Sequence, residues 1–205
     1  LHEDAPLYQR PMAQPEKLTD QEMQSTTPKS IEKDLMDLLM SPQWATSQYD
    51  SQLFLNTVIG PGSDAAVLRL KHPTSGADTG RGMALTTDGN HRWCAVNPRI
   101  GSAMTVAESV LNLACVGAVP QALVNCLNFG NPENPVVMWQ LSEAVDGMAE
   151  ACNAFQLPVV GGNVSLYNES QGKNIDPTPI VGVIGLIDDL VKPPPGLTWN
   201  DGDRI

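Results

Sequence analysis

The sequence has no apolar run close to the roughly 20 residues that a membrane-spanning helix requires. Its first residues, LHEDAPLYQRPM, lack a basic segment followed by an apolar one, so neither a secretory signal nor a membrane association is predicted. Basic residues are also scarce: 12 Lys and Arg stand against 23 Asp and Glu, which gives a formal net charge of −11. This balance argues against nucleic-acid binding, which needs a basic surface. It does not exclude a phosphorylated small ligand, because backbone N–H groups and metal ions also hold phosphates.

Several sequence patterns that would specify a chemistry are missing. Neither GxGxxG nor GxxxxGKS/T is present, so the two commonest nucleotide-binding fingerprints are absent. No Ser/His/Asp or Cys/His arrangement supports nucleophilic catalysis. The four cysteines are far apart and form no CxxC pair, which argues against a zinc site. Each lies in an apolar or helical context, and we therefore expect buried free thiols in a reducing, cytoplasmic compartment.

The chain is predicted to have three parts. Residues 1–48 are polar and proline-rich at first and are expected to form an arm with one helix, whose apolar face carries Ile31 and Leu35. Residues 49–190 should form a sheet domain. Residues 191–205 contain KPPPG at 192–196, a stiff linker, and end in what resembles the truncated start of a further domain.

Strand-like and helix-like segments alternate within the sheet domain. Predicted strands are 64–70, 83–90, 120–132, 157–165 and 178–190, and predicted helices are 102–118 and 136–156. Residues 72–82 are predicted to be a polar, glycine-rich turn. The βα units are irregular, so a single sheet covered on one face by long helices fits better than a doubly wound parallel sheet. The predicted fold class is therefore α+β, with a mixed or antiparallel sheet.

Polar side chains gather where the predicted strands end. These residues are Asp88, Asn125, Asn128, Asn163 and Ser165. Carboxylate and amide oxygens are ligands of Mg²⁺, which usually takes one or two of them together with water and phosphate oxygens. Each residue could instead simply close a strand, but that explanation weakens for the whole set.

Glu108 and Asn112 form a second candidate pair. They are four residues apart on the predicted helix 102–118 and lie on one face of it. A carboxylate is costly to bury unless it is paired or bound to a metal. Spacing alone leaves two alternatives open, a functional pair or an exposed face. His91 and Arg92, which follow Asp88, are expected in an exposed loop.

The order of several motifs resembles one known family. TTDGN, TVAESVLNLACVGA, LNFGNPENP, GGNVSLYNE and PTPIVGVIG are similar to the second half of phosphoribosylformylglycinamidine synthase, the synthetase subunit, from about Tyr49 to Asp189. That family uses ATP, Mg²⁺ and glutamine-derived ammonia to convert formylglycinamide ribonucleotide to formylglycinamidine ribonucleotide in purine biosynthesis. Its members contain two similar halves, each with a sheet domain like the N-terminal domain of aminoimidazole ribonucleotide synthetase, and the two sheets pair into a barrel.

The resemblance also implies roles for single residues. Asn125 and Gly162 match ATP contacts, Asn163 a Mg²⁺ ligand and Ser165 a contact to the ribonucleotide substrate. Many relatives have Asp in place of Asn125, so a negative charge is missing here. The family's catalytic histidine lies in a motif of the first half that this chain lacks, so none of its residues is predicted to be catalytic and the chain should be inactive alone.

A second nucleotide site is also implied. Asp88, Glu108 and Asn112 match the metal-binding positions of an auxiliary site, which is structural rather than catalytic in large members of the family. The implied partners are the first-half domains, a glutaminase subunit, a small bridging subunit and, for the chain alone, a second copy. Two alternatives remain: another ATP-using enzyme of the same superfamily, or a non-catalytic module that holds a structural nucleotide.

Overall fold

The computed structural model describes residues 8–17, 19, 30–38, 43–190 and 201–202. The polypeptide groups into two compact units. Unit 1 contains Leu1–Glu16, Thr87–Ser109 and Ala122–Gly182, and unit 2 contains Lys17–Thr86, Val110–Gln121 and Val183–Ile205. The boundary between the units falls inside three strands and one helix, so these elements contribute residues to both.

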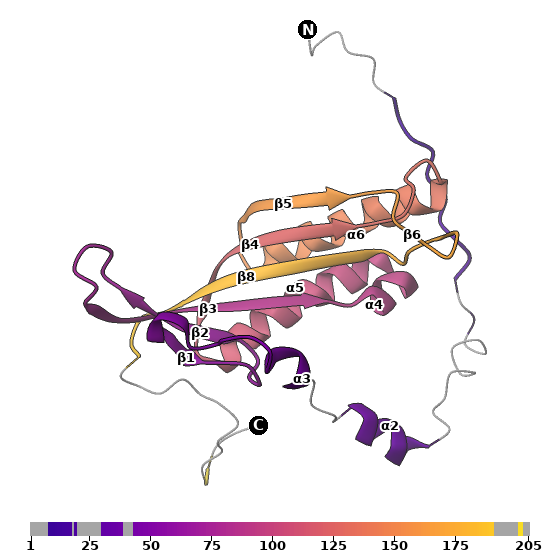
Figure 1. The fold of residues 1–205 in the computed structure, drawn as a ribbon. Coiled ribbons are helices and arrows are strands. Elements are labelled where there is room, and N and C mark those ends of the chain that lie inside the picture. The colour runs from indigo at the N-terminus through magenta and orange to yellow at the C-terminus, as the bar shows by residue number, and fades with distance from the viewer. Residues whose placement is uncertain (1–7, 18, 20–29, 39–42, 191–200, 203–205) are drawn as a thin grey trace, which may run out of the picture. The chain divides into compact units, whose positions relative to one another are not determined.

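A six-stranded sheet has the order β1-β2-β3-β8-β4-β5. Its strands are β1 (Thr57–Ile59), β2 (Ala66–Lys71), β3 (Asp78–Gly89), β4 (Val119–Asn128), β5 (Val159–Ser165) and β8 (Thr178–Ile187). β1–β2 and β2–β3 are antiparallel, whereas β4 and β5 are parallel. Figure 1 shows β8 running against both β3 and β4. The sheet is therefore mixed, as predicted.

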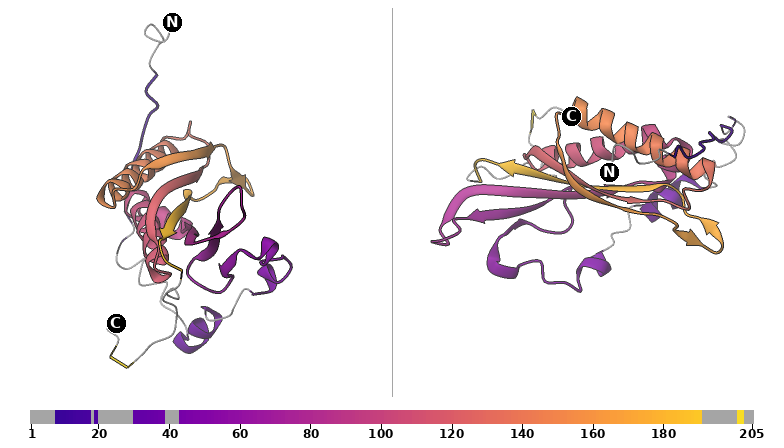
Figure 2. Two further views of the ribbon diagram at one scale, coloured as in Figure 1. Left: turned by 90° about the vertical axis from the view of Figure 1, so that its left-hand side faces the viewer. Right: turned by 90° about the horizontal axis from the view of Figure 1, so that it is seen from above.

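Unit 1 contains the helices that pack on the sheet. They are α4 (His91–Val96), the first part of α5 (Pro98–Cys115) and α6 (Pro135–Ala154). Figure 2 shows α5 and α6 on one face of the strands, in agreement with the predicted single helical layer. The alternating burial of β8 has the same origin: Pro179 and Val181 are buried on this helix face, whereas Ile180 between them is only half-buried on the opposite, open face.

Local sequence explains where these helices begin. Asn134 accepts a hydrogen bond from the backbone N–H of Val136, and Pro135 occupies the first turn, where its missing N–H is tolerated. Asn90 caps α4 in the same way through the N–H of Trp93. The expectation that His91 and Arg92 lie in a loop is therefore wrong: both are exposed, but they form the first turn of α4.

Unit 2 contains β1, β2 and the first part of β3, together with α2 (Ile31–Leu38), α3 (Gln43–Thr46) and the short helix η1 (Leu53–Leu55). β3 begins at Asp78, so the turn spans 72–77 rather than 72–82. The ion pair between Arg69 and Asp78, 2.6 Å long, spans the two strands close to this turn. The α2 helix is confirmed, although Ile31 remains 76% exposed. The proline linker at 192–196 lies outside the described residues.

The core of unit 1 lies between the helices and the sheet. Its fully enclosed side chains include Val106, Leu123, Phe129 and Val181. α6 approaches α5 closely at Gly147, where an added Cβ would lie 2.7 Å from the carbonyl carbon of Arg99. No described helix is long and apolar enough to cross a membrane.

The cysteines agree only partly with expectation. All four are free thiols, and Cys94 and Cys152 are buried. Cys126 is only half-buried and Cys115 is exposed, because it occupies the last position of α5 on the side away from the buried stripe. Burial also raises the pKa of the Cys94 and Cys152 thiols, so neither is an activated nucleophile at neutral pH.

Candidate functional site

Four of the predicted site residues lie where β4 and β5 run side by side. Asn125 pairs with Gly162, Cys126 with Asn163, and Asn128 with Ser165. Paired residues on neighbouring strands point to the same face of a sheet, and successive residues point to opposite faces. The four residues therefore separate into two sets, one on the helix face and one on the open face.

Asn125 and Gly162 lie on the helix face. The Asn125 amide nitrogen is 3.6 Å from the sulfur of Met148 on α6. A Cβ added at Gly162 would overlap the Asn125 side-chain oxygen and lie 2.8 Å from the Asn125 carbonyl oxygen. Glycine at 162 is thus required by the side chain of Asn125, and only its backbone is available to a ligand.

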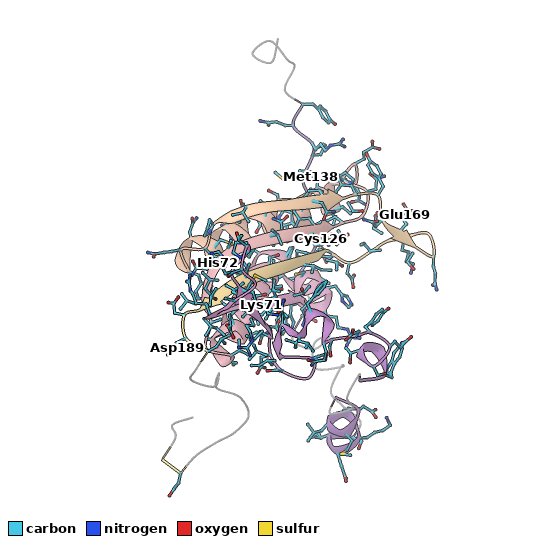
Figure 3. The ribbon with its side chains drawn as sticks, turned by 60° about the vertical axis from the view of Figure 1, so that its left-hand side comes forward. Lys71, His72, Cys126, Met138, Glu169 and Asp189 are labelled. Atoms are coloured by element: carbon cyan, nitrogen blue, oxygen red, sulfur yellow. The ribbon has the colours of Figure 1, made fainter. Side chains whose placement is uncertain are left out.

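Asn163 and Ser165 lie on the open face, in register with Cys126 and Asn128. Asn163 is exposed, and Ser165 is half-buried. Asn128 donates to the carbonyl oxygens of Cys126 (3.1 Å) and Thr178 (3.3 Å), which fastens the end of β4 to the start of β8. Figure 3 labels Cys126 on β4 and Glu169 on the hairpin that follows β5.

A short hairpin follows the GGNVS strand. It consists of β6 (Glu169–Ser170) and β7 (Lys173–Asn174), joined by Gln171 and Gly172, both with positive φ of 52° and 73°. Two positive φ values are the signature of the tight turns that match the twist of a hairpin. The sequence does not predict this hairpin, because Gln171 is an unusual residue for such a turn.

Two residues of the second predicted site, Asp88 and Glu108, lie in unit 1, whereas Asn112 belongs to unit 2. The Ser109 hydroxyl donates to Asp88 at 2.5 Å, which joins the end of β3 to α5. Glu108 is half-buried, so its face of α5 is not fully exposed. Burial raises the pKa of Glu108, and the negative charge of Asp88 raises it further. Asn112 lies one helical turn after Glu108 on α5.

These donor sets differ in how well they suit Mg²⁺. Among the described residues, no group of three His, Cys, Asp or Glu side chains could hold a metal ion. Asn163 offers one neutral oxygen, so phosphate oxygens and further ligands would have to complete a shell around it. Asp88 and Glu108 offer two carboxylates whose mutual repulsion a divalent cation would relieve. The carboxylates of Asp88 and Glu108 therefore fit a divalent cation better than the side chain of Asn163 does.

The sequence of residues 62–187 matches the family described as AIR synthase related protein, N-terminal domain. This region covers more than half of the chain and contains every strand from β2 to β8. The chain belongs to the AIR synthase related protein family. The sequence-based resemblance to this superfamily and the α+β fold are therefore confirmed.

Solved structures of Thermotoga maritima PurL resemble this member of the family. PurLQS has a TM-score of 0.68 and 32% identity over 89% of this chain and 28% of that chain. PurL complexed with ATP has a TM-score of 0.62 and 36% identity, and the match covers 72% of this chain and 23% of that chain. PurL complexed with FGAR has a TM-score of 0.61 and 36% identity, with the same coverage of 72% of this chain and 23% of that chain. The chain spans about a quarter of the length of these relatives.

Proposed function

We propose that this AIR synthase related domain is part of the ligase that converts formylglycinamide ribonucleotide, ATP and glutamine-derived ammonia to formylglycinamidine ribonucleotide, ADP and phosphate. The observation that carries the proposal is the similarity, at 36% identity, to PurL structures complexed with ATP and with FGAR. Residues 49–190 would be the ATP-binding domain. The cytoplasmic location is part of the same proposal.

The chemistry suits a domain that binds and orients rather than one that attacks. An amide oxygen leaves poorly until a phosphoryl group from ATP is attached to it, after which ammonia can displace it as phosphate. Positioning and charge stabilisation dominate such phosphoryl transfers. The described residues supply polar groups of this kind. We place the catalytic histidine in the first half, so that the isolated chain has no ligase activity.

Each site residue takes a role consistent with its face of the sheet. The backbone of Gly162 would approach the nucleotide, and Asn125 would support this backbone by packing over Gly162 on the helix face. On the open face, Asn163 would contribute one oxygen to Mg²⁺ and Ser165 would contact the ribonucleotide. Mg²⁺, when bound, neutralises phosphate charge.

We also propose that the open face pairs with the sheet of the first-half domain, or with a second copy when the chain is alone. Val124 on this face is 46% exposed, and Ile180 on β8 is half-buried, although both are apolar. Burial of such side chains favours association. A glutaminase and a small bridging subunit would complete the enzyme, as subunits accompany PurL in PurLQS.

A second candidate function is a module that holds a structural nucleotide. The juxtaposition of Asp88 and Glu108 favours it, because two neighbouring carboxylates suit a cation–phosphate group. This role does not require the β4–β5 residues, so the two functions can be separated by mutation.

Titration calorimetry with ATP and Mg²⁺ tests these assignments. We expect Asn163→Ala to abolish binding at a half-site on the open face, whereas Glu108→Ala should abolish binding at the auxiliary site. Asn153→Ala and Glu32→Ala are matched controls, since both side chains are exposed. If neither site variant changes a measurable affinity, both assignments are wrong.

The ligase itself is tested in the complete enzyme. We expect Asn163→Ala to reduce formation of formylglycinamidine ribonucleotide by about 10²-fold, the typical loss of an electrostatic stabiliser. Asn153→Ala should leave the rate unchanged. Wild-type enzyme that turns over ATP but forms no amidine from formylglycinamide ribonucleotide would contradict the proposed reaction.

A further inference from the structure

Two loops meet beyond the ends of β4 and β5. Phe129 and Gly130 follow β4, and Leu166, Tyr167 and Asn168 follow β5. The backbone N–H of Phe129 donates to the Ser165 carbonyl (3.0 Å), and the N–H of Tyr167 donates to the Gly130 carbonyl (2.9 Å). The loops therefore continue the pairing of β4 and β5 beyond the ends of these strands.

Asn168 holds this junction with its side chain. Its amide nitrogen lies 3.0 Å from the carbonyl oxygens of both Phe129 and Ser165. The same amide lies 3.1 Å from the Ser165 hydroxyl through its nitrogen and 3.3 Å through its oxygen. One side chain thus contacts the loop after β4, the backbone at the end of β5 and the hydroxyl of Ser165.

The hairpin that follows is fastened to the same loop. Asn174 accepts a hydrogen bond from the N–H of Asn131 at 2.8 Å, and its Cβ would lie 2.6 Å from a Cβ added at Gly130. The N–H of Ile175 donates to the Asn168 carbonyl at 3.2 Å. Asn168 is consequently held on both sides, and Tyr167 before it has a positive φ of 60°. A non-glycine residue in this conformation indicates a backbone that its surroundings constrain.

We propose that Asn168 is a positioning residue that fixes the Ser165 hydroxyl for contact with the ribonucleotide substrate. A serine hydroxyl otherwise occupies several rotamers, and its proton rotates freely. The contacts of the Asn168 amide restrict the rotamer of Ser165 and hold the end of β5 against the loop after β4. This inference rests on the substrate role of Ser165 in the proposed function. In this role Asn168 affects substrate binding through Ser165 and does not contact the substrate itself.

A double-mutant cycle in the complete ligase tests this role. Ser165→Ala and Asn168→Ala should each raise the KM for formylglycinamide ribonucleotide about tenfold, and the double variant should raise it about tenfold rather than a hundredfold. The KM for ATP should stay within about twofold of wild type. Asn168→Asp keeps the shape but removes the N–H donors, so we expect at least the same rise. Asn153→Ala is the matched control and should change neither KM.

The outcomes separate the inference from the proposed function. If Ser165→Ala leaves the KM for formylglycinamide ribonucleotide unchanged, the substrate role of Ser165 is wrong and the inference falls with it. If Ser165→Ala raises that KM but Asn168→Ala does not, or if their effects multiply, only the positioning role is wrong. A purely structural role of Asn168 would lower the melting temperature and kcat without a change specific to the ribonucleotide.

A milder variant covers the case in which Asn168→Ala does not fold. Asn168→Ser retains one short donor and should give a smaller rise in the same KM, again absent in the Ser165→Ala background. Circular dichroism and thermal unfolding establish that each variant is folded. No change in KM for a folded Asn168→Ser would overturn the proposal.

Discussion

Two groups of carboxylates in unit 1 have opposite surroundings. On α6, Glu143, Asp146 and Glu150 all lie near the guanidinium of Arg99, which makes a bidentate contact with Glu150. That hydrogen bond lowers the pKa of Glu150. Glu108 instead lies beside a second carboxylate, Asp88, and its pKa is raised by burial and by that charge.

This contrast separates a structural arrangement from a functional candidate. The α6 carboxylates have a cation from the protein itself, so their charge is balanced within the fold. The negative charge of Asp88 disfavours the ionised form of Glu108, and a divalent cation would reverse that effect. Strained or repulsive arrangements are found preferentially at sites where a ligand supplies the compensation.

The largest effect should come from breaking the contact that brings Arg99 to α6. A Cβ in Gly147→Ala would collide with the backbone of Arg99, so α5 and α6 must separate. We expect a loss of about 3 kcal/mol in the free energy of unfolding, the upper part of the range for overpacking. Urea denaturation measures it. Gly161→Ala is the control, because its nearest neighbour would be Val124 at 3.8 Å; an equal loss there would contradict the explanation.

A smaller effect is expected when the repulsive pair is neutralised. At a tenfold excess of Mg²⁺ over its dissociation constant, binding stabilises a protein by about 1.4 kcal/mol. We expect thermal unfolding to show this gain in the wild type and not in Glu108→Gln. Mg²⁺ that stabilises both proteins equally would exclude Glu108 as a ligand.

The same variant has a pH dependence without metal. Because the pKa of Glu108 is raised in the folded protein, folding favours the protonated form, and stability falls as pH rises from the ordinary carboxyl pKa through the folded one. Glu108→Gln should therefore be slightly more stable than wild type at pH 7 and equal to it at acidic pH. The reverse order at pH 7 would show that Glu108 is stabilised by a favourable partner.

The smallest effect should come from Glu150→Gln. The pKa of Glu150 is lowered, so its contribution is present above the ordinary carboxyl pKa of about 4.3 and is lost as pH falls through the lower folded pKa. We expect a slight drop in melting temperature at pH 7 and none at strongly acidic pH. Glu32→Gln, on an exposed position of α2, is the control. A large drop at pH 7 would mean that this exposed pair matters more than such pairs usually do.

The sequence could predict the existence of the long elements but not all of their contacts. The apolar residues Leu141, Val145, Met148 and Cys152 recur at steps of four, three and four, which predicts helix α6. Val145 is nevertheless exposed, and Gly147 makes the close contact with α5. The periodicity of apolar residues indicates which face of a helix is buried on average, whereas the close approach of two helices depends on a single small residue. The early start of β3 at Asp78 was hidden, because a polar, glycine-rich segment becomes a strand only through its pairing with β2.

The candidate site shows the same limit. Composition and the family motif predict Asn163 and Ser165 as site residues, and strand alternation alone separates Gly162 from them. Which of the two faces meets the helices depends on tertiary pairing. Asn168 was visible as a polar residue after the glycines, and nothing in the sequence indicates that its amide would span Phe129 and Ser165. Side-chain hydrogen bonds between distant loops become apparent only with the fold.

The pairing of β4 with β5 contains one irregularity whose consequence reaches the whole site. Leu123 pairs with Val159 and Val124 with Gly161, so Val160 has no partner and forms a bulge. The bulge shifts the register of the strand by one residue and so reverses which side chains face the helices. Without it, every later residue would exchange sides: Asn163 and Ser165 would point toward the helices, and Gly162 would point away from them. One unpaired valine therefore determines which face of the sheet carries the side chains of Asn163 and Ser165.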